Sequence, residues 1–527
     1  MQQPTIPSLI KLMMQPEFYP HPVTKPIQLI QTHISYVLLT GDYVYKVKKS
    51  VNLGFLNFST LSARHHFCQE ELRLNHILAP EIYLEVLPIT QQGHKFILGG
   101  NGEPQEYTLK MRQFSQDALL SKMLKQGKLT PELMTQLGRI VAQVHLQAAT
   151  NDYIRSFGEV NKIKKAIAQN YQQSQKYIGS LQTQPQYEET KEFSDRFFSS
   201  QTALLNQRQK NNWIRECHGD LHLDNICLWH NQIQLFDRIE FNEPFRFVDV
   251  MYDVAFLVMD LEAAGEPELA NVFLNTYVEQ TGDWEGLAVL PLYLSRQAYV
   301  RAKVNSWLWD NPTLTTENKR QIGNKASNYY HLAWEYTRPQ SGKLIMMSGL
   351  SGSGKTTVAR KLAQSLGAIH IRSDAVRKHL SGTPLEQSGA PSIYTSEMTQ
   401  KTYGRLLELG IKLASLGFTV ILDAKYDRRN LRKPVITQGQ NAQIPIEIVY
   451  CTATDKVLRD RILARTGDIS DATVDLLESQ KKAFETFTEA EKPLVIKSEL
   501  VLQDVTSPIY PFLAENCDNP PHPIPFR

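Results

Sequence analysis

The chain has 527 residues, which is above the size at which one hydrophobic core stops growing, so two or three domains are expected. Charged residues make up 21% and hydrophobic residues 42%, a balance typical of globular rather than disordered proteins. The formal net charge of +3 excludes a polycation, so nucleic acid stays open as a partner but is not indicated by composition.

The sequence shows no signal for a membrane or for export. No apolar run approaches the length of a membrane span, and the N-terminus lacks a charged-then-apolar signal pattern. We therefore expect a cytoplasmic protein with no membrane partner. The five cysteines form no C-x-x-C pair, and their odd number argues against a disulfide framework. We expect all of them to be reduced packing residues: Cys68, Cys217, Cys227, Cys451 and Cys517.

The first clear pattern is a hairpin over residues 34–49. Two alternating apolar runs flank the turn at residues 40–42, which is typical of paired antiparallel strands. The second strand carries Lys46 and Lys48. Because side chains alternate along a strand, these two lysines are expected on the same face.

A set of polar residues at fixed spacing lies further along, in HGDLHLDNI at residues 218–226 and QLFDRIEF at residues 234–241. Protein kinases carry a catalytic Asp, an Asn five residues later and a metal-binding Asp after the next hairpin. Those positions are Asp220, Asn225 and Asp237 here. The pattern predicts Asp220 as proton acceptor, with Asn225 and Asp237 holding Mg²⁺.

On these motifs, residues from about 32 to about 299 resemble the aminoglycoside phosphotransferase and choline kinase family, a small-molecule branch of the protein-kinase fold. The resemblance implies an α+β domain over residues 1–335 that uses ATP and Mg²⁺. The acceptor would be a hydroxyl of a small molecule. A helical insertion at residues 151–212 would determine substrate specificity.

The resemblance also implies an ATP-contacting lysine on the second strand of the hairpin. Lys46 is our choice for that role, and Lys48 is the alternative. The partner of the lysine would be Glu71, with Glu70 as the competing residue, and residues 111–114 would form the adenine-contacting hinge.

The sequence departs from the kinase pattern in the loop that covers the phosphates. No G-x-G-x-x-G precedes Lys46, so residues 31–35 would have to serve, with His33 or Ser35 in place of glycine. This departure leaves open a second interpretation, in which the N-terminal domain is a weak or inactive sensor.

A linker is predicted at residues 336–342, followed by a second domain at 343–503 and a proline-rich tail at 504–527. The second domain begins with an apolar strand at 344–348, a loop and a helix at 357–366. The loop fits the phosphate-binding pattern G-x-x-x-x-G-K-S/T at every fixed position.

The loop chemistry predicts how a nucleotide is held. Its glycines let backbone N–H groups point at the phosphates, Lys355 supplies a mobile charge, and the Thr356 hydroxyl can bind Mg²⁺. The predicted nucleotide contacts are Gly349, Ser351, Gly352, Ser353, Gly354, Lys355, Thr356 and Thr357.

Strands and helices then alternate along the chain. This order predicts an α/β P-loop NTPase with a parallel sheet, helices on both faces and a ligand crevice at the carboxyl ends of the strands. Asp374, Arg377 and Asp423 all follow predicted strand ends and would therefore face the crevice.

Residues from about 343 to 500 resemble the small P-loop kinases, such as gluconate kinase, zeta-toxin-type kinases and polynucleotide 5′-hydroxyl kinases. The resemblance implies that Asp374 and Arg377, as a D-x-x-R motif, handle the acceptor hydroxyl, with the Asp accepting its proton. Asp423 would be a Mg²⁺ residue, and a helix cap is the alternative.

The segment at residues 455–465 places Arg461 and Arg465 four residues apart on one helix face, which suits a lid over the transferring phosphoryl group. Arg459 points elsewhere, and a solvated charged helix is the alternative. Three more arginines follow the Asp423 strand and could hold an anionic substrate: Arg428, Arg429 and Arg432.

The sequence as a whole predicts a bifunctional two-domain phosphotransferase with two Mg·ATP sites. Two alternatives remain. In the first, the N-terminal domain is a sensor and the C-terminal half is a polynucleotide or toxin-type kinase. In the second, the chain is a non-enzymatic switch that changes shape when ATP binds.

Overall fold

The computed structural model describes residues 6–93, 95–464, 469–471 and 473–498. The chain divides into two compact units, each described below by itself. One unit comprises the residues up to 129 together with 147–165 and 201–257, and the other comprises 130–146, 166–200 and the residues from 258 onward. The predicted boundaries at 1–335, 336–342 and 343–503 stay predictions, and the tail predicted at 504–527 lies outside the described residues.

The first unit is built on a six-stranded antiparallel sheet with the strand order β1-β2-β3-β6-β4-β5. The predicted hairpin at 34–49 is confirmed, because β2 and β3 pair antiparallel around the expected turn. The strands are β1 Gln28–Gln31, β2 Ser35–Leu39, β3 Tyr43–Lys48, β4 Tyr83–Gln92, β5 Lys95–Leu98 and β6 Pro104–Arg112.

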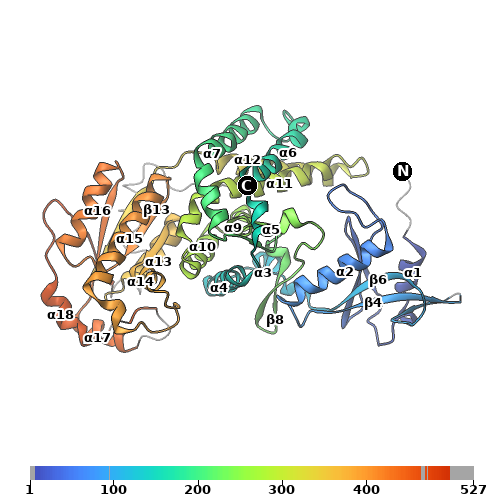
Figure 1. Ribbon diagram of the computed structural model, residues 1–527, viewed down its shortest axis with the longest axis horizontal. Coiled ribbons are helices and arrows are strands. Elements are labelled where there is room, and N and C mark those ends of the chain that lie inside the picture. Colours follow the sequence, from blue (N-terminus) through green and yellow to red (C-terminus); the bar gives the residue numbers. More distant parts are fainter. Residues whose placement is uncertain (1–5, 94, 465–468, 472, 499–527) are drawn as a thin grey trace. The chain divides into compact units, whose positions relative to one another are not determined.

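The two faces of this sheet are covered differently. Helix α2, Leu61–His76, lies along the sheet beside β4 and β6 (Figure 1). Tyr45 and Val47 belong to a cluster with Ile10 and Met13 of the short helix α1, Ser8–Met13. Because side chains alternate along β3, Lys46 and Lys48 point to the opposite face, and both make ion pairs with α2.

The remaining helices and strands of the first unit come after the sheet in the sequence. Strands β8 and β9 form an antiparallel hairpin, and β7 pairs with β10. The elements are α3 Leu120–Lys125, α5 Asp152–Arg155, β7 Ile214–Glu216, β8 Ile226–Trp229, β9 Gln232–Leu235, α8 Glu243–Arg246 and β10 Phe247–Asp249.

Most of the long helices before residue 336 contribute to the second unit, and four of them (α4, α6, α7 and α9) span residues of both units. Helix α7 is kinked at Gln201, whose φ and ψ are not helical. The segment predicted as a helical insertion, 151–212, contains α6 and α7. The helices are α4 Pro131–Gln147, α6 Val160–Ser174, α7 Gln184–Lys210, α9 Val250–Ala263, α10 Pro267–Thr281, α11 Leu290–Trp309 and α12 Thr316–Glu335.

The second unit also contains a five-stranded sheet with the order β12-β13-β11-β14-β15, in which every neighbouring pair is parallel. Its elements are β11 Lys343–Ser348, α13 Lys355–Leu366, β12 Ile369–Arg372, α14 Ser373–Ser381, α15 Ser396–Ser415, β13 Thr419–Asp423, α16 Arg429–Asn441, β14 Ile446–Thr452, α17 Asp455–Leu463, α18 Leu476–Ala483 and β15 Leu494–Lys497.

Helices cover both faces of the parallel sheet, as Figure 1 shows around β13. Ile345 and Ile421 belong to a core cluster with α13 residues. Leu344 and Leu422 point the other way, toward Gly410 of α15, where an added Cβ would lie 3.1 Å from Leu422 Cδ2. Central strands buried on both faces are expected to be continuously apolar, and β11 is. The predicted α/β fold is confirmed.

Helix α10 protects the edge strand of this sheet within the second unit. Asn271 and Asn275 donate from Nδ2 to the Ala368 carbonyl at 3.0 and 2.9 Å, and His370 N donates to Asn275 Oδ1 at 2.7 Å. An edge strand exposes unpaired backbone groups. The two asparagine side chains bond the carbonyl that precedes β12 and one N–H group within the strand.

Among the described residues, no helix combines the length and apolar character that a membrane crossing requires. The four cysteines that the structure describes are free thiols and are buried, in agreement with their predicted packing role. Cys517 lies outside the described residues.

Glu262 of α9 accepts a hydrogen bond from the Tyr336 hydroxyl at the C-terminal cap of α12. Burial raises the pKa of the Glu262 carboxyl from 4.5 to about 7, although the Tyr336 hydroxyl opposes the shift. Because the folded state then binds a proton that the unfolded state has released, the free energy of unfolding should fall as pH rises from 4.5 to 7.

We expect Glu262→Gln to remove this dependence and to stabilise the protein at pH 8 by on the order of 3 kcal/mol, measured by urea unfolding across pH. Glu268→Gln, at an exposed position of α10, is the control and should keep the parental slope. A parental slope in Glu262→Gln would contradict the assignment.

Candidate active sites

The P-loop of the second unit depends on glycines whose backbone no other residue adopts easily. Gly349 has φ +142°, and a Cβ there would lie 2.3 Å from the Cys451 carbonyl oxygen. Gly352 has φ +79°, and a Cβ there would lie 2.6 Å from the Leu458 carbonyl oxygen. The loop is thereby packed against β14 and α17, which fix its backbone.

The loop is also tied to the segment that follows β13. Gly349 N donates to the Lys425 carbonyl at 3.0 Å, and Ser348 Oγ lies 3.1 Å from the carbonyls of Lys425 and Tyr426. Tyr426 has φ +41°, an unusual value for a bulky residue, and such values concentrate at functional sites.

The polar side chains of the loop are arranged for a ligand that carries phosphate. Lys355 Nζ donates to the Leu350 carbonyl at 2.8 Å, and burial lowers the pKa of Lys355. Ser353 Oγ is buried and has no hydrogen-bond partner among the described residues. Ser351 N donates to Gln480 Oε1 at 3.0 Å, while Thr356 is half-buried and Thr357 exposed at the start of α13. The unpartnered Ser353 hydroxyl and the glycine-rich backbone of the loop fit the phosphates of the predicted nucleotide.

Asp423 ends β13 and makes a buried hydrogen bond that the sequence did not predict. His370 Nε2 lies 3.0 Å from Asp423 Oδ2, and both side chains are buried. Burial alone would raise the pKa of Asp423, but the hydrogen bond and the charge of His370 lower it to about 2. Asp423 is therefore held as a carboxylate, the form that binds Mg²⁺.

Asp374 and Arg377 lie on α14, directly after β12. Burial raises the pKa of Asp374, a direction that suits a proton acceptor. Arg377 is buried and donates from Nη1 to the Ile393 carbonyl at 3.0 Å and to Thr399 Oγ1 at 3.3 Å. Its Nε has no hydrogen-bond partner among the described residues.

Arg461 of α17 lies beside the P-loop. It donates from Nη1 to Ser498 Oγ at 2.7 Å and approaches the Gly352 carbonyl at 3.5 Å. Arg459 points elsewhere, as expected, and pairs with Glu478 at 2.8 Å. Arg465, the second predicted lid arginine, lies outside the described residues.

The expectation that Arg432 holds an anionic substrate is wrong. Its guanidinium is fully buried, pairs with Glu491 at 2.6 Å and lies 4.6 Å from the centre of the Phe487 ring. Arg432 points toward the protein interior because its position on α16 belongs to the packed face. The position of Arg432 shortly after a strand end in the sequence did not indicate that its side chain points inward.

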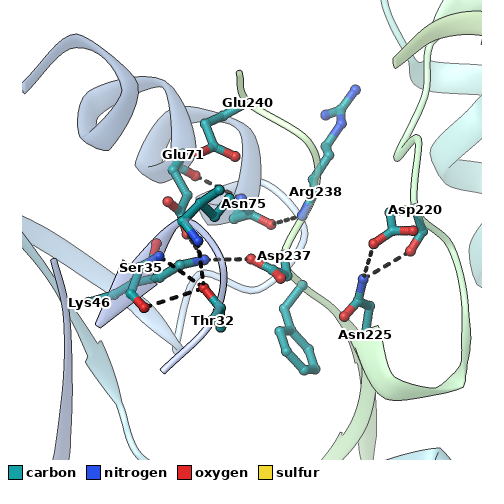
Figure 2. A network of polar contacts seen from close by, with 12 residues as sticks. Thr32, Ser35, Lys46, Glu71, Asn75, Asp220, Asn225, Asp237, Arg238 and Glu240 are labelled. Atoms are coloured by element: carbon teal, nitrogen blue, oxygen red, sulfur yellow. Dashed lines mark hydrogen bonds and ion pairs between the residues drawn. The ribbon is translucent and has the colours of Figure 1, made fainter. Parts of the chain in front are cut away.

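In the first unit, Lys46 joins two of the predicted site residues. Its Nζ lies 2.7 Å from Glu71 Oε1 and 2.7 Å from Asp237 Oδ1 (Figure 2). Glu70 pairs instead with Arg73 on the surface of α2. Glu71 is therefore the partner of the lysine, as we expected.

Lys48 also contacts Glu71, on the other carboxylate oxygen at 2.6 Å. The two lysines were alternatives for one role, but the structure brings both to the same carboxylate. Burial alone would raise the pKa of Glu71, and the charges of Lys46 and Lys48 lower it to about 2. Glu240, which the sequence analysis did not single out, is the second partner of Lys48.

Asp237 is held in a left-handed backbone conformation with φ +60°. Its N–H donates to the Tyr83 hydroxyl at 3.0 Å, and the next N–H, of Arg238, donates to Asn75 Oδ1 at 2.8 Å. These bonds tie the segment after β9 to β4 and α2. The Asp237 carboxylate is 45% exposed, so it stays accessible to a metal ion.

The predicted catalytic loop is also built from local contacts. Asn225 Nδ2 donates to the backbone carbonyl of Asp220 at 3.0 Å and to its carboxylate at 3.2 Å (Figure 2). Phe236 N donates to the Asn225 carbonyl at 3.0 Å, which brings the residue before Asp237 to the same loop. Asn225 is therefore linked directly to Asp220, and the backbone of Phe236 places Asp237 next to the same loop.

Gly219 is required for the shape of this loop. It has φ +85°, and a Cβ there would lie 2.6 Å from the Phe245 carbonyl oxygen. The N–H groups of His218 and Gly219 donate to the two carboxylate oxygens of Asp253 at 2.6 and 2.8 Å. Asp253 thus fixes the loop that presents Asp220.

The glycine-free loop at 31–35 is closed by a threonine side chain. Thr32 Oγ1 accepts hydrogen bonds from Ser35 N at 2.9 Å and from Ile34 N at 3.3 Å. The predicted hinge at 111–114 begins within the last two residues of β6, and Gln113 Oε1 accepts from Gly41 N at 2.9 Å. Both segments flank β3, the strand that carries Lys46.

Comparison with known proteins gives one family match. A family model described as an AAA domain matches residues 344–487. An uncharacterized protein of Mycobacterium tuberculosis is 28% identical over 463 residues, covering 86% of this chain and 90% of the relative.

Two solved structures illustrate the likeness of the parts. An amicoumacin kinase in complex with AMP-PNP, Ca²⁺ and Ami has a TM-score of 0.37 at 13% identity and covers 61% of this chain and 92% of its own. A gluconokinase from Sinorhizobium meliloti has a TM-score of 0.23 at 21% identity and covers 34% and 90%.

The predicted two-domain combination fits these comparisons, since the family match falls within the predicted P-loop domain. The family match supports nucleotide binding by the P-loop domain. The roles of individual residues in catalysis and in metal binding stay predictions.

The close contact at Gly349 gives a direct test of the P-loop. We expect Gly349→Ala to remove one nucleotide-binding site per chain, because the new Cβ would collide with the Cys451 carbonyl and the strained φ would cost about 1–3 kcal/mol. Isothermal titration with ATP measures the number of sites and their affinity.

The matched control is Gly404→Ala in α15, where nothing lies within 4 Å of an added Cβ. This variant should bind ATP like the parent, and both variants should keep the parental circular dichroism. Parental binding by Gly349→Ala would refute the assignment of the loop.

Proposed function

We propose that the chain is an ATP-dependent phosphotransferase with two nucleotide sites, each transferring the γ-phosphate to a hydroxyl of a small molecule. The proposal is supported by two groups of contacts in the first unit, together with a P-loop in the second. Lys46 contacts Glu71 and Asp237, and Asn225 contacts Asp220. Bound Mg·ATP would supply the phosphoryl group at both sites.

In the first unit the residues divide the work by their chemistry. Lys46, held by Glu71, would donate to phosphate oxygens, while Asp237 and Asn225 would hold the metal. Asp220 would accept the proton of the acceptor hydroxyl. His222 Nε2 lies 3.4 Å from the Asp220 carboxylate and would orient it.

In the second unit the backbone does more of the binding. The glycine cradle and Lys355 would hold the phosphates, and Thr356 and Asp423 would hold the metal. Asp374 would accept the acceptor proton, Arg377 would orient the acceptor, and Arg461 would neutralise charge on the transferring group from its place beside the loop.

The first-unit site can be tested in the full-length chain with Lys355→Ala in every variant, which silences the P-loop. We expect Asp220→Asn to bind Mg·ATP like its parent but to lower kcat by roughly 10²–10⁴, since an amide of the same shape cannot take a proton. Asp237→Ala should weaken Mg·ATP binding itself.

Transfer is measured with labelled ATP against sugars, amino alcohols and aminoglycosides. Asp224→Asn is the matched control, because Asp224 lies in the same loop and is exposed. If the Lys355→Ala parent transfers phosphate to none of these acceptors, and Asp237→Ala binds Mg·ATP like that parent, the first unit is not an active kinase. Nucleotide binding without transfer in either unit would favour an ATP-dependent switch.

A further inference from the structure

Glu71 is shared by two lysines from the same strand. Lys46 Nζ contacts Oε1 at 2.7 Å, and Lys48 Nζ contacts Oε2 at 2.6 Å. The proposed phosphate contact needs one lysine and one glutamate. The second lysine therefore needs an explanation of its own.

Lys48 has no route to a ligand. Its side chain is 1% exposed, its second ion-pair partner Glu240 is 5% exposed, and its Nζ lies 4.9 Å from the centre of the Phe58 ring. Lys46, in contrast, is 13% exposed and also contacts the exposed Asp237. Lys48 thus contacts only buried groups, whereas Lys46 faces the proposed nucleotide site.

The charges alternate from the site into the interior, in the order Asp237, Lys46, Glu71, Lys48 and Glu240. Burying an ion pair costs free energy, and a pair of apolar side chains of similar volume is often as stable. The ion pair of Lys48 and Glu240 is therefore better explained by the positions in which it holds its neighbours than by a contribution to the free energy of folding.

The geometry links three segments of the chain. Glu71 belongs to α2, Lys48 to β3, and Glu240 to the segment that follows Asp237. In the next turn of α2, Asn75 donates to the Glu71 carbonyl at 2.9 Å and accepts from Arg238 N at 2.8 Å. Figure 2 shows Glu71, Asn75, Arg238 and Glu240 gathered beside the contact between Lys46 and Asp237.

This arrangement matters most when the site is in use. If Asp237 turns to a metal ion and Lys46 to phosphate, Lys46 keeps only Glu71 as its protein partner. A carboxylate held by one lysine alone could follow that lysine or rotate away. With Lys48 on the other oxygen, Glu71 stays in place.

We propose that Lys48 and Glu240 are positioning residues of the first-unit nucleotide site, which hold the Glu71 carboxylate and through it the Lys46 ammonium. This inference rests on the proposed function of that site. In this proposal, the ion pairs of Lys48 with Glu71 and Glu240 keep α2 packed on β3 both with and without bound nucleotide.

The test uses the full-length chain with Lys355→Ala in every variant and measures binding of Mg·AMP-PNP and of adenosine by calorimetry. Lys48→Met combined with Glu240→Gln removes both charges, so no buried ion is left unpaired. We expect the Kd for Mg·AMP-PNP to rise about tenfold, the scale of one weakened charge-assisted hydrogen bond, with the Kd for adenosine within twofold of the parent.

The matched control is Lys110→Met combined with Glu85→Gln. These residues form a 2.9 Å pair on β6 and β4, and Lys110 lies opposite Tyr45 in the register, on the face of the sheet away from Lys46. The control should bind both probes like the parent. Glu240→Gln alone keeps Lys48 on Glu71 and should give a smaller rise in the Kd for Mg·AMP-PNP.

Unchanged Mg·AMP-PNP binding in the double variant overturns the inference. Equal weakening for Mg·AMP-PNP and adenosine also overturns it, because the pair would then only stabilise the fold. If the Lys355→Ala parent itself shows no Mg·AMP-PNP binding that Asp237→Ala weakens, the proposed function of the site fails, and the inference fails with it.

Discussion

In both proposed sites, the lysine that would contact phosphate is held by partners within the protein. In the first unit Lys46 is held by Glu71 and Asp237. In the second, Lys355 donates to the Leu350 carbonyl of its own loop. A side chain held in this way loses less conformational freedom on binding than a free one.

The two sites differ in how much of the binding the backbone performs. The P-loop needs glycines, because its N–H groups converge only when residues such as Gly349 and Gly352 adopt positive φ. The first unit uses side-chain charge instead, and its loop at 31–35 is closed by Thr32 Oγ1 rather than by glycine.

Much of this organisation could be predicted from local sequence patterns. The P-loop, the catalytic loop and the alternation of strands and helices all lie within short segments, so spacing alone was sufficient. Strand alternation placed Lys46 and Lys48 on one face but could not choose between them, and the structure uses both. The choice of Glu71 over Glu70 held because only one of the two faces the sheet.

The contacts that sequence could not predict join segments far apart in the chain. His370 meets Asp423 because β12 and β13 are neighbours in the sheet, and Glu240 meets Lys48 across 192 positions. Strand order decides the first contact, and the packing of the segment after β9 decides the second. No local periodicity predicts either of them. Arg432 was misassigned for the same reason, since its direction depends on the packing of α16 against later residues.

The parallel sheet also depends on residues that precede it in the chain by many positions. Strand β12 is the edge strand, and its end leads directly to Asp374. Asn275 of α10 satisfies its backbone, and Glu279 of the same helix lies 3.5 Å from Arg372, the last residue of β12. Arg372 in turn lowers the pKa of Asp374, against the larger effect of burial. The electrostatics of the candidate P-loop active site are therefore set in part by a helix outside the segment in which the nucleotide motif lies.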